Sequence, residues 1–151
     1  EEGLSKFACM ATSWNDVLVP VRFLATTGQL LGTVAVMLDM KPHVLSSLPE
    51  THSSEDYGSA YSDCMAVLAL SILGLLLELI GLIIGFSLFD SFTNEIHCGL
   101  HSLGCAVAVV IGFGNGNYAY LWYTYWVCGA LPLLVEAISW LNLFWLRRAA
   151  Y

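Results

Sequence analysis

The chain has 151 residues, of which 58% are hydrophobic and only 11% are charged, and its formal net charge is −7. A soluble domain carries about 25% charged residues, so this composition, with a mean hydropathy of +0.72, indicates an integral membrane protein in contact with the lipid bilayer. The five Lys and Arg residues form no basic stripe, which argues against nucleic-acid binding.

The first membrane span is expected at about residues 17–40, after a polar N-terminal segment at 1–16. Gly28 and Gly32 form a GxxxG step within it, a spacing that favours close packing against another helix. Gln29 lies near the middle of the same span.

Residues 41–63 contain two prolines, many serines and several acidic residues, which is typical of a loop. We expect them to form one outer loop in which His43 and His52 are exposed.

The second span, at about 64–89, is almost wholly apolar and carries a single acidic residue, Glu78, near its middle. Small residues recur on the helical face that holds this carboxyl group. That face contains Ser71, Gly74, Glu78, Gly81 and Gly85. In lipid, such a pattern predicts a buried helix contact, because small side chains allow close approach and the carboxyl group avoids hydrocarbon.

The third span is expected at about 97–113 and the fourth at about 125–146. His97, His101 and Cys105 share one face of the third span, with Gly104 beside it. A polar turn at 90–96 joins the second and third spans into a hairpin.

In the fourth span, Gly129, Glu136 and Trp140 share a face. Pro132 has no backbone donor, so it should kink this helix or weaken its hydrogen bonding. The aromatic residues before the span are typical of a membrane-interface belt. They are Tyr120, Trp122, Tyr123, Tyr125 and Trp126.

Four spans place both termini on the same side of the membrane. Basic residues near the first and last spans favour the cytoplasm for that side, whereas Lys41 is the only basic residue expected opposite. The basic residues near the termini are Lys6, Arg22, Arg147 and Arg148.

Polar side chains of different spans should meet at a similar depth. Gln29, Glu78 and Glu136 are expected near the bilayer midplane, with His101 about one turn away. Ionisable residues inside a membrane mark functional positions, because a charge there costs several kcal/mol. These residues could form a proton relay, an ion site or a set of hydrogen bonds that holds the helices together. We favour the third role, in which a neutral carboxyl group donates a hydrogen bond to Gln29 or to a backbone carbonyl.

Metal binding and catalysis find less support in the sequence. His97 and His101 could share an ion or a haem, but no other span offers a histidine. We therefore expect neither a metal nor another cofactor, and favour polar residues that are hydrogen-bonded across a helix contact. The serines lack a nucleophile loop, and no catalytic residues are expected.

The order of these features resembles the transmembrane protein 107 family of small four-span proteins of the ciliary transition zone. The resemblance covers nearly all of residues 19–148. It rests on VPVRFL at 19–24, ELIGLIIGFSLF at 78–89, His101, TYWVCGALPLLVE at 124–136 and the basic ending at 147–148.

This resemblance implies a non-enzymatic membrane organiser at the base of the cilium. Such proteins join the Meckel and Joubert syndrome module and help to control which membrane proteins enter the cilium. The positions that match the family are Arg22, Glu78, His101, Trp126, Pro132 and Glu136. The family's acidic position before the fourth span is absent here, where GNGNYAY stands.

The sequence therefore predicts an all-α bundle of four transmembrane helices that packs with other integral membrane proteins through small-residue faces. One alternative is an accessory subunit of a large mitochondrial or plastid membrane complex. A less favoured one is a proton or ion conductor that uses Glu78, His101 and Glu136.

Overall fold

The computed structural model describes the backbone of residues 2–85, 91–114 and 116–149, and within these ranges the side chains of 16–142 and 145. All its regular elements are helices. In chain order they are α1 (Glu2–Leu38), α2 (Met40–Leu45), α3 (Ser54–Ile84), α4 (Ser91–Gly114), α5 (Ala119–Tyr125), the π-helix η1 (Trp126–Ala130) and α6 (Leu131–Ala149).

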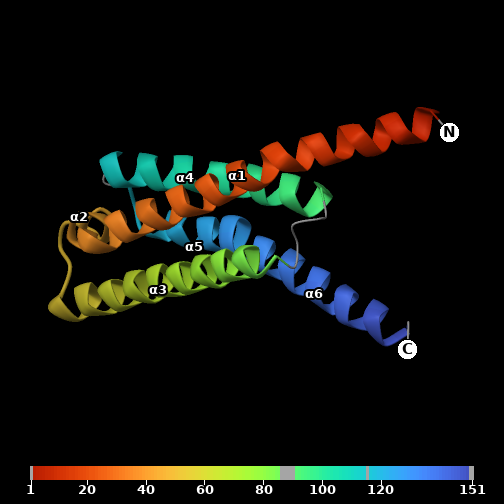
Figure 1. Cartoon of the computed structure of the whole chain (residues 1–151). Helices are drawn as coiled ribbons and strands as arrows, with labels where there is room; N and C mark the ends of the chain where they lie inside the picture. Colours follow the sequence, from red (N-terminus) through yellow and green to blue (C-terminus); the bar gives the residue numbers. More distant parts are fainter. Residues whose placement is uncertain (1, 86–90, 115, 150–151) are drawn as a thin grey trace.

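Four segments are long and apolar enough to cross a membrane, which confirms the predicted all-α four-span bundle. They are Asp16–Leu38, Ser54–Ile84, Ser91–Gly114 and Ala119–Asn142. The fourth consists of α5, η1 and the first part of α6. In Figure 1, α1 begins and α6 ends at the same end of the bundle, while α2 lies at the opposite end.

Three spans begin earlier than the hydropathy pattern indicates; the fourth, expected at about 125–146, begins at Ala119. Residues 54–63, expected in the outer loop, form the first turns of α3. The Ser53 side chain accepts a hydrogen bond from the Asp56 backbone, and the Asp56 side chain accepts one from the Ser53 backbone, which makes a capping box. Residues 91–96, expected as a turn, are the first turns of α4; residues 86–89, assigned to the second span, lie outside the described residues.

Helix α2 carries a histidine whose position differs from expectation. His43 is buried, with 2% of its surface exposed, and its Nδ1 lies 3.2 Å from the carbonyl oxygen of Gly116. This contact joins α2 to the segment that precedes α5. His52, by contrast, is exposed as expected.

Glycines allow close contact between α1 and α4, which pack along each other most extensively. A Cβ atom on Gly28 would lie 3.3 Å from Cys105 Sγ, and one on Gly32 would lie 3.0 Å from Ala108 Cβ. The second distance is shorter than carbon atoms normally approach, so α4 packs where a side chain on Gly32 would stand.

The bundle has two halves that differ in the chemistry of their buried side chains. The half nearer α2 is packed with apolar residues. They are Val36, Met40, Val44, Ala60, Cys64, Val67, Leu68, Ile111 and Leu121. The half nearer the chain ends buries most of the polar and charged side chains. These include Arg22, Gln29, Glu78, Asn94, His97, His101 and Glu136.

Replacing Gly32 by Leu should destabilise the bundle, because the new side chain has to push α4 away; overpacking of this kind costs about 1–3 kcal/mol. The free energy of unfolding in mixed detergent micelles measures the effect. Gly99→Leu is the matched control, since Gly99 lies on the same helix pair with nothing within 4 Å of a Cβ atom. Equal stability of the two variants would contradict the proposed contact.

Candidate functional site

An ion pair between the first and last spans lies inside the bundle. Arg22 Nη2 donates a hydrogen bond of 2.7 Å to Glu136 Oε2, and Arg22 Nη1 donates one of 2.9 Å to Asn94 Oδ1. Arg22 is 1% exposed and Glu136 is 3% exposed. The guanidinium group thus joins α1 to both α4 and α6, which suits its planar set of donors.

The position of Arg22 corrects a prediction from the sequence. From the sequence, Arg22 counts among the basic residues near the first span that favour a cytoplasmic N-terminus. It lies inside the apolar segment Asp16–Leu38 of α1, and its side chain is buried in the bundle. A buried, paired arginine is part of the bundle and does not contribute to the charge of a loop.

The second oxygen of Glu136 also has a partner. Trp140 Nε1 donates a hydrogen bond of 3.2 Å to Glu136 Oε1, one helical turn along α6. On the α3 side, a Cβ atom on Gly81 would stand 2.9 Å from this oxygen. The absence of a side chain at Gly81 therefore makes room for the carboxylate.

Gln29 connects α1 to the π-helix and to α4. Its Nε2 donates a hydrogen bond of 3.2 Å to the carbonyl oxygen of Cys128. In an α-helix that carbonyl would accept from residue 132, which is a proline without an N–H group. On the other side, Gln29 lies directly against Gly104, where a Cβ atom would overlap its amide group.

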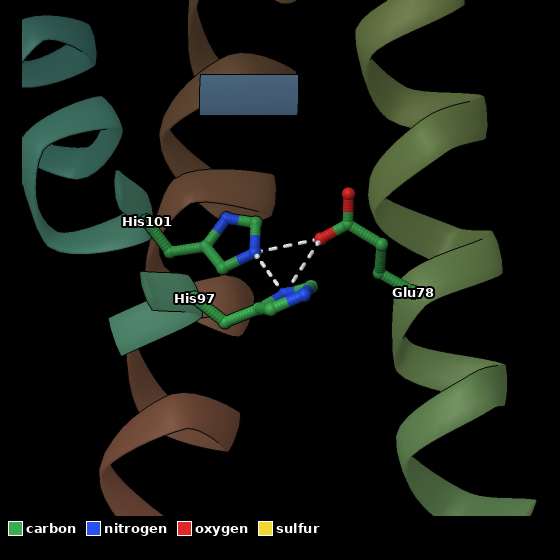
Figure 2. A group of neighbouring side chains, drawn as sticks. All are labelled: Glu78, His97 and His101. Carbon is green, nitrogen blue, oxygen red and sulfur yellow. Dashed lines mark hydrogen bonds and ion pairs between the residues drawn. The ribbon is translucent and has the colours of Figure 1, made fainter. Parts of the chain in front are cut away.

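Glu78 of α3 meets two histidines of α4 (Figure 2). Glu78 Oε2 lies 2.6 Å from His101 Nε2 and 3.8 Å from His97 Nδ1. The two ring nitrogens are 3.4 Å apart, and both histidines are 0% exposed. His97 Nε2, at the other side of its ring, points toward Glu136 Oε2 at 3.7 Å.

The neighbours of Gln29 determine which nitrogen of His101 carries hydrogen. The Cys128 carbonyl can only accept, so the amide nitrogen of Gln29 faces it and Oε1 faces His101 Nδ1, at 2.9 Å. Oε1 also only accepts, so Nδ1 of His101 is the donor. A neutral His101 then presents a lone pair at Nε2 to the Glu78 carboxylate.

Two lone pairs repel at 2.6 Å, so the contact between His101 and Glu78 requires positive charge or hydrogen between them. A proton on either group meets this need, and so does a cation bound by both. Neither Glu78 oxygen accepts an aligned hydrogen bond from a described residue, and His97 Nε2 also lacks one. This cluster is where the buried network is least satisfied.

The structure brings Gln29, Glu78, His101 and Glu136 into one connected network, with Arg22, Asn94 and His97 added to them. The sequence favours His97 as a polar residue hydrogen-bonded across a helix contact over a metal ligand, and it does not single out Asn94. The burial of His97 could have been found from its spacing, since it lies one turn before His101 on the same face.

The remaining expected packing residues have different surroundings. Gly74 is buried, but nothing lies within 4 Å of a Cβ position there, and a Cβ atom on Gly129 would meet Tyr125 at 3.6 Å. Gly85 ends α3 in the left-handed conformation, with φ of 88°, which glycine adopts without strain. Its role in the described part of the chain is therefore a helix cap.

The other two family-matched residues lie at the π-helix. Trp126 is its first residue and is 61% exposed, which suits contact with lipid or another protein. Pro132 is buried just beyond it.

Ser71 of α3 donates a hydrogen bond of 2.7 Å to the Val67 carbonyl. It also lines a cavity of about 20 Å³ beside Gln29, which has room for one water molecule.

Comparison with known proteins agrees with this arrangement. The family model TMEM107, described as a transmembrane protein, matches residues 18–140. The chain belongs to the transmembrane protein 107 family. It is 30% identical over 139 residues to transmembrane protein 107 of Homo sapiens, covering 89% of this chain and 96% of the human protein.

Other members of the transmembrane protein 107 family match over similar lengths. The Xenopus laevis protein is 28% identical over 134 residues, covering 87% of this chain and 94% of its own. The Mus musculus protein is 24% identical over 137 residues, with 89% and 96% covered. No solved structure matches the chain. The region matched to the family model contains every residue of the buried network.

Replacing Arg22 by Met should lower the free energy of unfolding by about 3–5 kcal/mol, because it leaves the Glu136 carboxylate buried without its cation. The double variant Arg22→Met with Glu136→Gln should recover much of this loss, since no unpaired charge remains. Detergent unfolding measures both. Val21→Met, at an exposed neighbouring position, is the control; a double variant less stable than Arg22→Met would contradict the ion pair.

Proposed function

We propose that the chain is a non-enzymatic organiser of the ciliary transition zone, which packs with other integral membrane proteins and helps to control the protein composition of the ciliary membrane. The ciliary assignment is supported by the resemblance to the transmembrane protein 107 family. The observation that carries the structural part is the buried network, which joins all four spans into one unit.

The direction of the side chains supports a structural role. The ionisable groups of the network are turned inward, and Arg22 and Glu136 neutralise each other. Large apolar side chains cover the outside of every span. Examples are Leu31 on α1, Ile83 on α3, Phe113 on α4 and Leu141 on α6. Such a surface can contact lipid chains and the apolar surfaces of neighbouring membrane proteins.

The buried histidines and carboxyl groups are the observation that favours a second candidate, a proton conductor. A conductor needs groups that exchange protons in sequence and water that connects them to both membrane faces. The apolar half of the bundle lies between the network and the α2 end. Since the cavity beside Gln29 has room for about one water molecule, we favour the structural role.

A tagged copy of the chain expressed in ciliated cells should concentrate at the base of the cilium and copurify with other integral membrane proteins in mild detergent. Arg22→Met should lose this localisation, because the bundle is destabilised, whereas Val21→Met should keep it. Fluorescence microscopy beside a basal-body marker measures the position. Accumulation of the unaltered chain in mitochondria or plastids would favour the accessory-subunit alternative and contradict the proposal.

Liposomes that contain the purified chain should collapse a proton gradient no faster than protein-free liposomes, because the structural role requires no conduction. A pH-sensitive dye inside the vesicles measures the rate. Glu78→Gln is the matched variant, since it keeps the shape of the side chain and removes its ionisable group. Proton flux in the unaltered chain that disappears in Glu78→Gln would establish the conductor instead.

A further inference from the structure

We propose that Glu78, His97 and His101 form a buried binding site for a divalent transition-metal ion, for which Zn²⁺ is the best match. The three residues each offer one ligand atom, and these atoms all lie within 4.8 Å of one another. Figure 2 shows them converging from α3 on one side and α4 on the other. The site goes beyond the proposed function and does not depend on it.

The distances between the ligand atoms fit a tetrahedral zinc ion. Zinc bonds of about 2.0–2.1 Å to nitrogen or oxygen place neighbouring ligands of a tetrahedron about 3.3 Å apart. Here the three separations are 2.6 Å from His101 Nε2 to Glu78 Oε2, 3.4 Å from His101 Nε2 to His97 Nδ1 and 3.8 Å from His97 Nδ1 to Glu78 Oε2. They bracket the expected value, so small side-chain rotations would equalise them.

The hydrogen-bonding state of the cluster also favours a cation. Both oxygens of Glu78 are buried without an aligned hydrogen bond from any described residue. No described Lys or Arg lies within ion-pair distance of Glu78. The buried Arg22 forms its ion pair with Glu136. A metal ion between Glu78 and His101 replaces the repulsion of their lone pairs by two coordinate bonds.

His101 has a hydrogen-bonded neighbour that can orient it as a ligand, and His97 has a carboxylate close to its second ring nitrogen. Metal-bound histidines usually donate their second ring N–H to a carbonyl or carboxylate oxygen. His101 Nδ1 has Gln29 Oε1 at 2.9 Å. His97 Nε2 faces Glu136 Oε2 at 3.7 Å, which is beyond hydrogen-bond distance in this structure, and Arg22 fixes that carboxylate. The lone pair that remains on His101 Nε2 faces Glu78, and His97 presents its Nδ1 to the same carboxylate.

The ligand types determine which ion is preferred. Two imidazole nitrogens and one carboxylate favour zinc and other transition metals over magnesium and calcium, which prefer oxygen ligands. The spacing of His97 and His101 also places both rings on one face of α4, as in the helical zinc motifs that use histidines four residues apart. A water molecule can complete the tetrahedron at the fourth position.

The test uses the full chain purified in detergent with an affinity tag that contains no histidine. Co²⁺, which takes the place of Zn²⁺ and absorbs visible light when bound, is titrated into metal-free protein. We expect saturation at one ion per chain with a tetrahedral absorption spectrum, and competition by Zn²⁺ but not by Mg²⁺. A titration of the unaltered chain that shows no spectrum, or only non-saturating binding, overturns the proposal.

Variants assign the site to its residues. His97→Ala and Glu78→Gln should abolish the tetrahedral spectrum, and Gln29→Leu should weaken Co²⁺ binding by about 10–100-fold, the usual effect of removing a residue that orients a ligand. His43→Ala is the matched control, because it removes a buried histidine that lies outside the cluster. Circular dichroism and gel filtration confirm that each variant is folded.

Each result has a definite meaning for the site. Loss of the spectrum in the folded variants His97→Ala and Glu78→Gln, with binding kept in His43→Ala, supports the assignment. Retention of the spectrum in both cluster variants places the ion elsewhere and overturns it. If a cluster variant does not fold, the titration of the unaltered chain still decides, together with a Zn²⁺-dependent rise in its thermal stability.

Discussion

The buried ion pair between Arg22 and Glu136 is the interaction on which the rest of the polar network depends. Its partners are 114 residues apart in sequence, so the pair forms only when the first and last spans lie side by side. Each charge alone would be costly inside a membrane. Arg22 also binds Asn94 of α4, and Glu136 lies against Gly81 of α3. The pair therefore favours the one arrangement in which all four spans meet.

A second series of contacts links the backbone of the fourth span to the Glu78 cluster. Pro132 cannot donate to the Cys128 carbonyl, and the amide of Gln29 does so instead. This bond fixes the orientation of Gln29, which in turn fixes the donor nitrogen of His101. The lone pair that faces Glu78 thus follows from a proline on another helix. A π-helix at this point fits the general association of such helices with specialised sites.

The sequence predicts the number and type of helices well, because hydrocarbon thickness sets span length and composition. It also predicts Gln29, Glu78 and Glu136 at similar depth, with His101 about one turn away. It does not place Arg22, because a charge near the start of a span has the same hydropathy whether it points to water or into the bundle. Nor does it separate a loop from polar helical turns, as residues 54–63 show, since capping lies outside the apolar pattern.

The apolar and polar halves of the bundle contribute differently to the choice of which helix faces pack together. Lipid chains are as apolar as Val and Leu, so apolar packing in a membrane gains little from burial and depends on shape. The half near α2 should therefore tolerate swaps between apolar side chains of similar volume, which cost less than about 1.5 kcal/mol. In the other half, a misplaced helix leaves a charge or an amide without its partner. The arrangement of the four helices is thus specified mainly by the polar half of the bundle. Within that half, Glu78 remains the group with the fewest hydrogen bonds.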